Sequence, residues 1–164
     1  MTWATWRIDD DCLRGAPRIR IERRGPDPFG FIPKVLDVVQ RVLGIKKTDM
    51  WESDFRWDIW TAPVRFMVRN YAIKTFDPKT TMQVEITFNG EQPEDPKESH
   101  RLLIDIAARL RTRYGLKGVF QQSWFYRLLL RAHHFSTYAR ERERYLTACT
   151  ELVERLAAEI RKLI

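Results

Sequence analysis

Apolar and polar residues alternate with a period of two along much of the first half of the chain. The segment 17–24 alternates Ile19 and Ile21 with charged residues and ends at Gly25-Pro26, which predicts a half-buried strand. The same alternation, with short Pro-containing links between the runs, predicts three further strands at 50–60, 64–76 and 80–89. Short links favour antiparallel pairing of neighbouring strands, so we expect a meander.

The segment 101–114 fits both periods. Read as a strand, it places Leu102, Ile104 and Ile106 on one face, and the alternation continues to its end. Read as a helix, Leu103 and Ile106 begin an apolar stripe, and the Ala107-Ala108 pair favours that state. We favour a strand, because it would protect one edge of the meander.

Apolar residues at steps of three and four predict helices at 32–44, 119–135 and 137–163. Pro33 suits the first turn of the first helix, and Gly44 suits its C-terminal cap. We predict no regular element in 1–15. The chain is expected to form a single α+β domain over 1–164. Its antiparallel meander has four or five strands, one helix follows the first strand, and the long C-terminal helices pack on the aromatic face.

The composition predicts one ordinary globular domain and adds a basic C-terminal part. Of the 164 residues, 44% are hydrophobic and 31% are charged, which argues against wholesale disorder. The net charge is +7, and it is concentrated in 101–164. A positive field of this kind attracts phosphates, anionic membranes or acidic partners without choosing among them.

Cys12 and Cys149 lie far apart in the sequence and have no CxxC-type spacing. We therefore expect no disulfide framework and a reducing compartment. The N-terminus has no apolar run of the signal-peptide type, and no segment reaches the roughly 20 apolar residues of a transmembrane span. These observations predict a cytoplasmic protein.

The carboxylates Glu52, Asp54 and Asp58 alternate with aromatic residues and suggest either a chemical site or the wet face of a strand. A hairpin of 50–60 with 64–76 would place Asp54 opposite Arg69 and Asp58 opposite Arg65. The arginines would keep both aspartates ionised, so we expect structural ion pairs rather than an acid–base pair.

No other motif fixes a reaction. Asp9 to Asp11 could bind a hard cation but lack the spaced ligands of a calcium loop, and a solvated turn is the simpler interpretation. His133 and His134 are adjacent, so on a helix they point in different directions and do not share a metal. We predict no catalytic residue, metal ligand or cofactor. An enzyme without a linear motif stays open, although nothing argues for one.

The aromatic face of the predicted sheet suggests binding of an apolar small molecule between sheet and C-terminal helix. The alternative is a fully packed core without a cavity. The residues expected to share this face are Trp51, Phe55, Trp57, Phe66, Met82, Val84, Ile86 and Phe88. As ligand-binding residues we predict Trp57, Phe66, Ile86 and Tyr145.

Two other binding hypotheses compete with this one. Arginines on the predicted fourth strand and on the last helix could contact phosphates of nucleic acid, and a solvated charged surface is the alternative. The arginines concerned are Arg109, Arg111, Arg113 and Arg142. The segment 123–135 could lie in a membrane interface, with Arg127 and Arg131 on anionic headgroups. We favour its burial against the sheet or in a subunit interface. In the second case the protein would be a homodimeric assembly module.

The order of elements over 17–90 and 137–163 resembles an abbreviated helix-grip fold, the architecture of START-type lipid-binding domains. The resemblance implies a curved sheet that holds the final helix around an apolar cavity. The predicted sheet has fewer strands than that fold, and one initial helix instead of two, and fold alone does not carry function.

Overall fold

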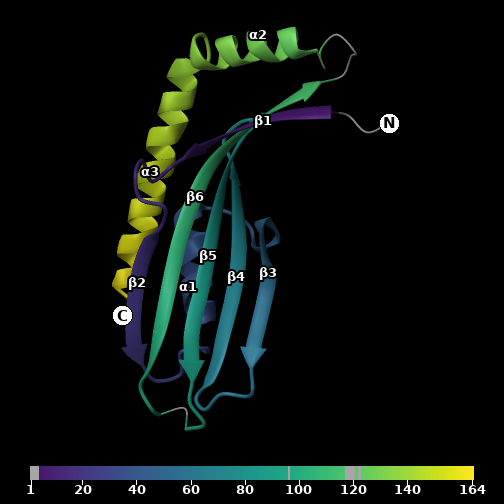
Figure 1. Cartoon of the computed structure of the whole chain (residues 1–164). Coiled ribbons are helices and arrows are strands. Elements are labelled where there is room, and N and C mark those ends of the chain that lie inside the picture. Colours follow the sequence, from purple (N-terminus) through teal and green to yellow (C-terminus); the bar gives the residue numbers. More distant parts are fainter. Residues whose placement is uncertain (1–3, 96, 117–120, 122) are drawn as a thin grey trace.

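The longest strand, β6 (His100–Leu116), organises the molecule, because two other strands pair with different parts of its length (Figure 1). The computed structural model describes residues 4–95, 97–116, 121 and 123–164. The other strands are β1 (Ala4–Asp11), β2 (Ile19–Gly25), β3 (Met50–Asp58), β4 (Val64–Thr75) and β5 (Thr80–Gln92). The helices are α1 (Ile32–Leu43), α2 (Trp124–Phe135) and α3 (Ala139–Arg161), with a 3-10 turn at Lys47–Asp49.

Within the described residues, six strands form one antiparallel sheet in the order β1-β6-β5-β4-β3, with β2 also paired to β6. The predicted α+β class and antiparallel meander are confirmed, and so is a strand over 101–114. That segment is a strand because it has ladder partners on both edges. β5 pairs along one edge, while β2 pairs with 100–106 and β1 with 109–116 on the other.

β1 is the strand that the sequence did not predict. Only Trp6 and Ile8 alternate with polar residues before the run of three aspartates, so the local pattern is weak. The strand is specified by its partner: Asp9 lies opposite Arg111 in the ladder, and its carboxylate accepts a hydrogen bond from that guanidinium at 3.0 Å. The aspartates therefore do not form the solvated turn that we expected.

One face of the sheet carries the core and is covered by α1 and α3 (Figure 1). Side chains at even positions of β5 and β6, such as Ile86 and Ile104, are fully buried there against residues such as Val39 of α1 and Leu156 of α3. Burying each such side chain contributes about 1.5–3 kcal/mol. Gly44 ends α1 with φ 62°, a left-handed conformation that favours glycine.

The β3–β4 hairpin has the predicted register, with Trp57 opposite Phe66 and Asp58 opposite Arg65. A bulge between Glu52 and Asp54 was not predicted. Because the extra residue reverses the alternation, Trp51 pairs with Tyr71 on the uncovered face instead of sharing a face with Trp57.

The ion pairs of this hairpin differ from those we expected. Among the described residues, Asp54 pairs with Arg56 on its own strand at 3.3 Å. Arg69 reaches Glu85 on β5 at 3.8 Å, and Arg65 reaches Glu91 at 3.7 Å. The two arginines thus turn to β5, because a central strand offers its side chains a neighbour on either side.

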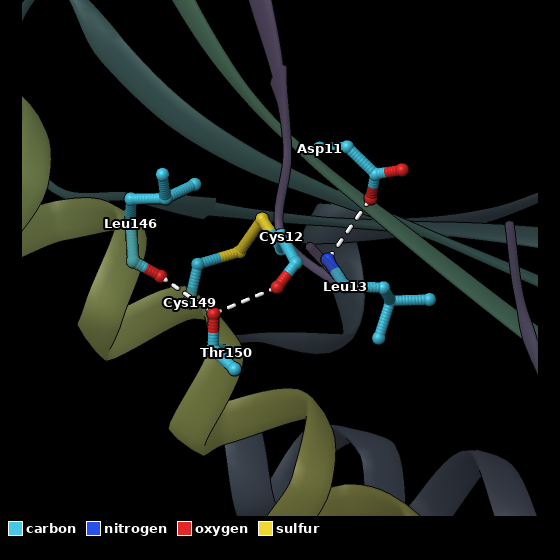
Figure 2. The surroundings of a disulfide bond; sticks show 6 residues. All are labelled: Asp11, Cys12, Leu13, Leu146, Cys149 and Thr150. Atoms are coloured by element: carbon cyan, nitrogen blue, oxygen red, sulfur yellow. Dashed lines mark hydrogen bonds between the residues drawn. A yellow bond between two sulfur atoms is a disulfide. The ribbon is translucent and has the colours of Figure 1, made fainter. Parts of the chain in front are cut away.

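The two cysteines form a disulfide, so the prediction of unpaired cysteines was wrong (Figure 2). Cys12 follows β1 and Cys149 lies in α3, with 5.6 Å between their Cα atoms and no exposed surface on either. The Thr150 hydroxyl donates to the Cys12 carbonyl oxygen at 2.7 Å. Spacing along the chain carries no information about such a long-range pair. The cytoplasmic location stays a prediction, but unpaired cysteines no longer support it.

α2 extends away from α3 at the end of the sheet where β1 lies (Figure 1). Of its side chains only His134 is buried, so α2 is not packed against the sheet as the sequence led us to expect. The Nδ1 atom of His134 and the Tyr114 hydroxyl share a hydrogen bond of 2.9 Å, and the Nε2 atom of His134 lies 3.9 Å from a carboxylate oxygen of Asp10. This contact anchors the C-terminal end of α2 to β1 and β6.

Candidate functional site: an apolar groove at the end of the sheet

The structure brings together two of the four predicted ligand-binding residues. Trp57 and Phe66 stack with their ring centroids 5.8 Å apart, and Phe29 packs edge-on against both. Ile86 is fully buried in the core, and Tyr145 stacks on Phe76 from α3. The four residues therefore do not line one cavity between the sheet and the C-terminal helix.

Trp57 and Phe66 instead contribute to a groove of about 600 Å³ at the end of the sheet, next to the β3–β4 turn. Its remaining apolar surface comes from residues in the turn, in β4 and in β6. We call it the Trp60 groove and define it by Trp57, Trp60, Phe66, Met67 and Leu103, with the backbone of Gly90.

Gly90 lines the groove and also lies against side chains of the core. A Cβ atom at this position would lie 2.5 Å from the Phe66 ring and 3.1 Å from a methyl group of Leu102. Glycine therefore lets the Phe66 ring pack directly over the β5 backbone. The ring in turn stacks on Trp57 on the core side of the sheet, whereas Met67 and Leu103 of the groove stand on the opposite face.

Trp60 is held by a hydrogen-bonded turn yet is itself 91% exposed. Its backbone N–H donates to the Asp58 carboxylate at 3.0 Å, and the Thr61 hydroxyl donates to the Asp58 carbonyl oxygen at 3.3 Å. The Arg65 N–H donates back to the Thr61 hydroxyl at 3.3 Å. The turn thus presents a large indole ring to solvent on an ordered backbone.

Cations and carboxylates surround the apolar surface. The guanidinium groups of Arg56, Arg65 and Arg101 line the groove together with the carboxylates of Asp58 and Glu91. The arginine side chains are 73%, 68% and 51% exposed, and each has a carboxylate within 4 Å. Exposed pairs of this kind contribute only about 0–1 kcal/mol, so an acidic ligand can replace one partner at small cost.

Sequence reasoning missed Trp60, Met67 and Leu103. We placed Trp60 at the end of a strand, whereas the neighbouring Pro-containing link favours a place in the turn, and loops often carry binding residues. Met67 and Leu103 stand at odd positions, on the polar face of their strands. Apolar residues in that register are a signal that could have been used.

The arginines predicted to bind nucleic acid do not form one surface. Arg109, Arg111 and Arg113 project from the uncovered face of β6, where Arg111 is paired with Asp9. Arg142 forms a two-point ion pair with Asp10, at 2.6 and 2.9 Å. Because Asp9 and Asp10 are neighbours on a strand, they point to opposite faces. No observation favours nucleic-acid binding, which stays a prediction.

The uncovered face also holds a buried carboxylate, Asp105, which is 5% exposed. Arg20 donates to both of its oxygens, at 2.7 and 2.9 Å, and Arg18 approaches at 3.5 Å. The hydrogen bonds and charge of Arg20 lower the pKa of Asp105 below its usual range. The carboxylate is ionised and neutralised, so we assign it to fastening β2 onto β6.

The buried side chain of His134 is also structural. Burial lowers the pKa of its imidazole, and the nearby Asp10 carboxylate opposes that change only in part. Next to it, the Tyr138 hydroxyl donates to Asp77 at 2.8 Å, and burial raises the pKa of that phenol. The described residues contain no group of three or more side chains arranged to hold a metal ion.

Comparison with known proteins gives no relative from which to transfer a function. No protein-family model, curated protein or solved structure matches the chain. The helix-grip resemblance therefore stays an expectation. In the part of the chain that the structure describes, no helix has the length and apolar character needed to span a membrane.

Proposed function

We propose that the protein binds a small, largely apolar molecule in the Trp60 groove. One observation carries the proposal: a 91% exposed indole ring lies at an apolar groove of about 600 Å³. That volume is in the range of small-molecule sites, about 300–1,000 Å³. The expected ligand has a ring or acyl part for the aromatic wall.

The same groove supports an acidic group on the ligand. Arg56, Arg65 and Arg101 border the apolar surface, and each has at least half of its side chain exposed. A carboxylate, sulfonate or phosphate on one end of the molecule would pair with a guanidinium while the apolar end contacts Trp60. The function remains the apolar-ligand binding that the sequence suggested, at a different place and without Ile86 or Tyr145.

A titration with 8-anilinonaphthalene-1-sulfonate, an aromatic anion, tests the proposal. The chain has six tryptophans, whose indole N–H signals separate in ¹H–¹⁵N NMR spectra. Substitution of Trp57, Trp60 or Trp124 by alanine assigns those three signals. We expect the Trp60 signal to shift and saturate, and Trp60→Ala to weaken binding measured at Trp57 about tenfold, since stacking and burial of an indole contribute roughly 1–2 kcal/mol.

Trp124→Ala is the matched control, because this tryptophan is 76% exposed on α2, at the other end of the molecule. It should leave the titration of the Trp60 signal unchanged. A Trp60 signal that stays in place up to about 1 mM probe would overturn the proposal. So would equal affinities of the wild type and Trp60→Ala.

A further inference from the structure

α2 presents an apolar face to solvent. At roughly 100° per residue, its exposed apolar side chains fall within an arc of about 140°. The opposite side of the helix is the one that reaches the body through His134. We call this set the α2 arc; it consists of Trp124, Phe125, Leu128, Leu129 and Phe135, which are 76%, 48%, 55%, 49% and 50% exposed.

Cations border the α2 arc. On the helical wheel Arg131 lies about 20° and Arg127 about 60° outside the edge of the arc that is nearer to His134, and both are exposed. Neither forms an ion pair with another described residue. In the sequence, residues 106–140 contain seven lysines and arginines and no aspartate or glutamate. The face therefore combines an apolar centre with two arginines at its border that form no ion pair within the described residues.

The charges are also separated along the molecule. The segment 91–99, which covers the end of β5 and the link to β6, contains four carboxylates and one lysine. Figure 1 shows this link at the end of the sheet opposite α2. A molecule with this charge distribution turns its α2 end toward a negative surface.

We propose that the α2 arc docks the protein onto an anionic lipid membrane. The helix lies in the plane of the interface, with Trp124 and Leu128 inserted at the level of the headgroups and Arg127 and Arg131 on lipid phosphates. The Trp60 groove lies at the other end of the sheet and stays open to solvent in this orientation (Figure 1). The proposal does not depend on what the groove binds.

Charge favours a lipid surface over a second copy of the chain. Two copies joined through the α2 arc would bring their copies of Arg127 and Arg131 close together. The surrounding segment, 106–140, offers no carboxylate to pair with them. Anionic headgroups supply that counter-charge and also an apolar layer for the exposed side chains.

Sedimentation with vesicles tests the proposal. The full chain is mixed with phosphatidylcholine vesicles, with or without about 30% phosphatidylglycerol. We expect binding to the anionic vesicles that falls as NaCl rises from about 20 to about 300 mM. The double variant Arg127→Gln/Arg131→Gln should bind about 30-fold more weakly, at about tenfold in affinity per 1.4 kcal/mol and roughly 1 kcal/mol for each cation near the surface.

A second variant tests the apolar contribution, and a third is the matched control. Leu128→Ser/Leu129→Ser should reduce binding at least tenfold. Arg24→Gln/Arg41→Gln removes two arginines that are 76% and 69% exposed elsewhere and should change binding less than twofold. All substituted residues are exposed, so the thermal unfolding midpoint should not move. If the leucine variant does not fold, the arginine variant decides.

Three outcomes would overturn the proposal. One is the absence of binding to anionic vesicles at low salt. Another is equal weakening by the control and by Arg127→Gln/Arg131→Gln. The third is a dimer in sedimentation velocity that Leu128→Ser/Leu129→Ser dissociates, without vesicle binding, which would assign the α2 arc to a second copy.

Discussion

Breaking the disulfide between Cys12 and Cys149 should strongly destabilise the protein. The two residues are 137 positions apart, so the bond closes most of the chain into one loop. In the chain-entropy relation, a loop of this length gives about 5 kcal/mol at 25 °C. Measured values are commonly about 2–4 kcal/mol, and the bond also fastens α3 to the end of β1. We expect a loss of about 3–5 kcal/mol in the free energy of unfolding.

Urea unfolding with and without dithiothreitol measures this loss. With an m value of about 2 kcal/mol/M, the midpoint should fall by roughly 1.5–2.5 M in the reduced protein. The double variant Cys12→Ala/Cys149→Ala is the control. Its midpoint should be low and the same with or without the reductant. A fall of less than about 0.5 M in the wild type would refute the loop-closure argument.

Three further predictions concern single residues. Burial lowers the pKa of His134 in the folded protein, so the unfolded chain binds the proton more readily and the free energy of unfolding should decrease as pH falls below about 6.5. Urea midpoints measured from pH 7 to 5 should show a smaller decrease in His134→Gln than in the wild type; an equal slope would show that Asp10 offsets the effect of burial. Asp105→Asn should lower the free energy of unfolding by about 1 kcal/mol at pH 7. Because the carboxylate has a lower pKa in the folded protein than in the unfolded chain, the variant should also lose less stability than the wild type below about pH 3.9; an unchanged midpoint of acid unfolding would contradict this. Gly90→Ala should destabilise by about 1–3 kcal/mol in thermal unfolding, because the new methyl group displaces the Phe66 ring; an unchanged midpoint would show that the ring can move freely.

The sequence by itself determined the elements that depend on local patterns. The period of two predicted β2 to β6, and the three- and four-residue spacing predicted α1 and α3. It also predicted the β3–β4 register, with Trp57 opposite Phe66, because a short link leaves few alignments that bury one face. These features are local, since each strand or helix must present one apolar side to the core.

Only the tertiary structure decided the features that join distant segments. β1 is a strand because β6 offers it a ladder and Arg111 neutralises Asp9, and the disulfide exists because β1 ends beside α3. The bulge at Ser53 sent Trp51 to the uncovered face, which an unbroken alternation does not reveal.

The functional surfaces were likewise decided by assembly. The Trp60 groove combines a turn with side chains from β3, β4 and β6, so no single segment contains its pattern. The sequence of α2 is apolar on several sides, and its outward face became known only when His134 was found to be the side chain that α2 buries. Local periodicity indicates which residues of an element form its apolar face. Which of these residues stay exposed depends on how the elements pack.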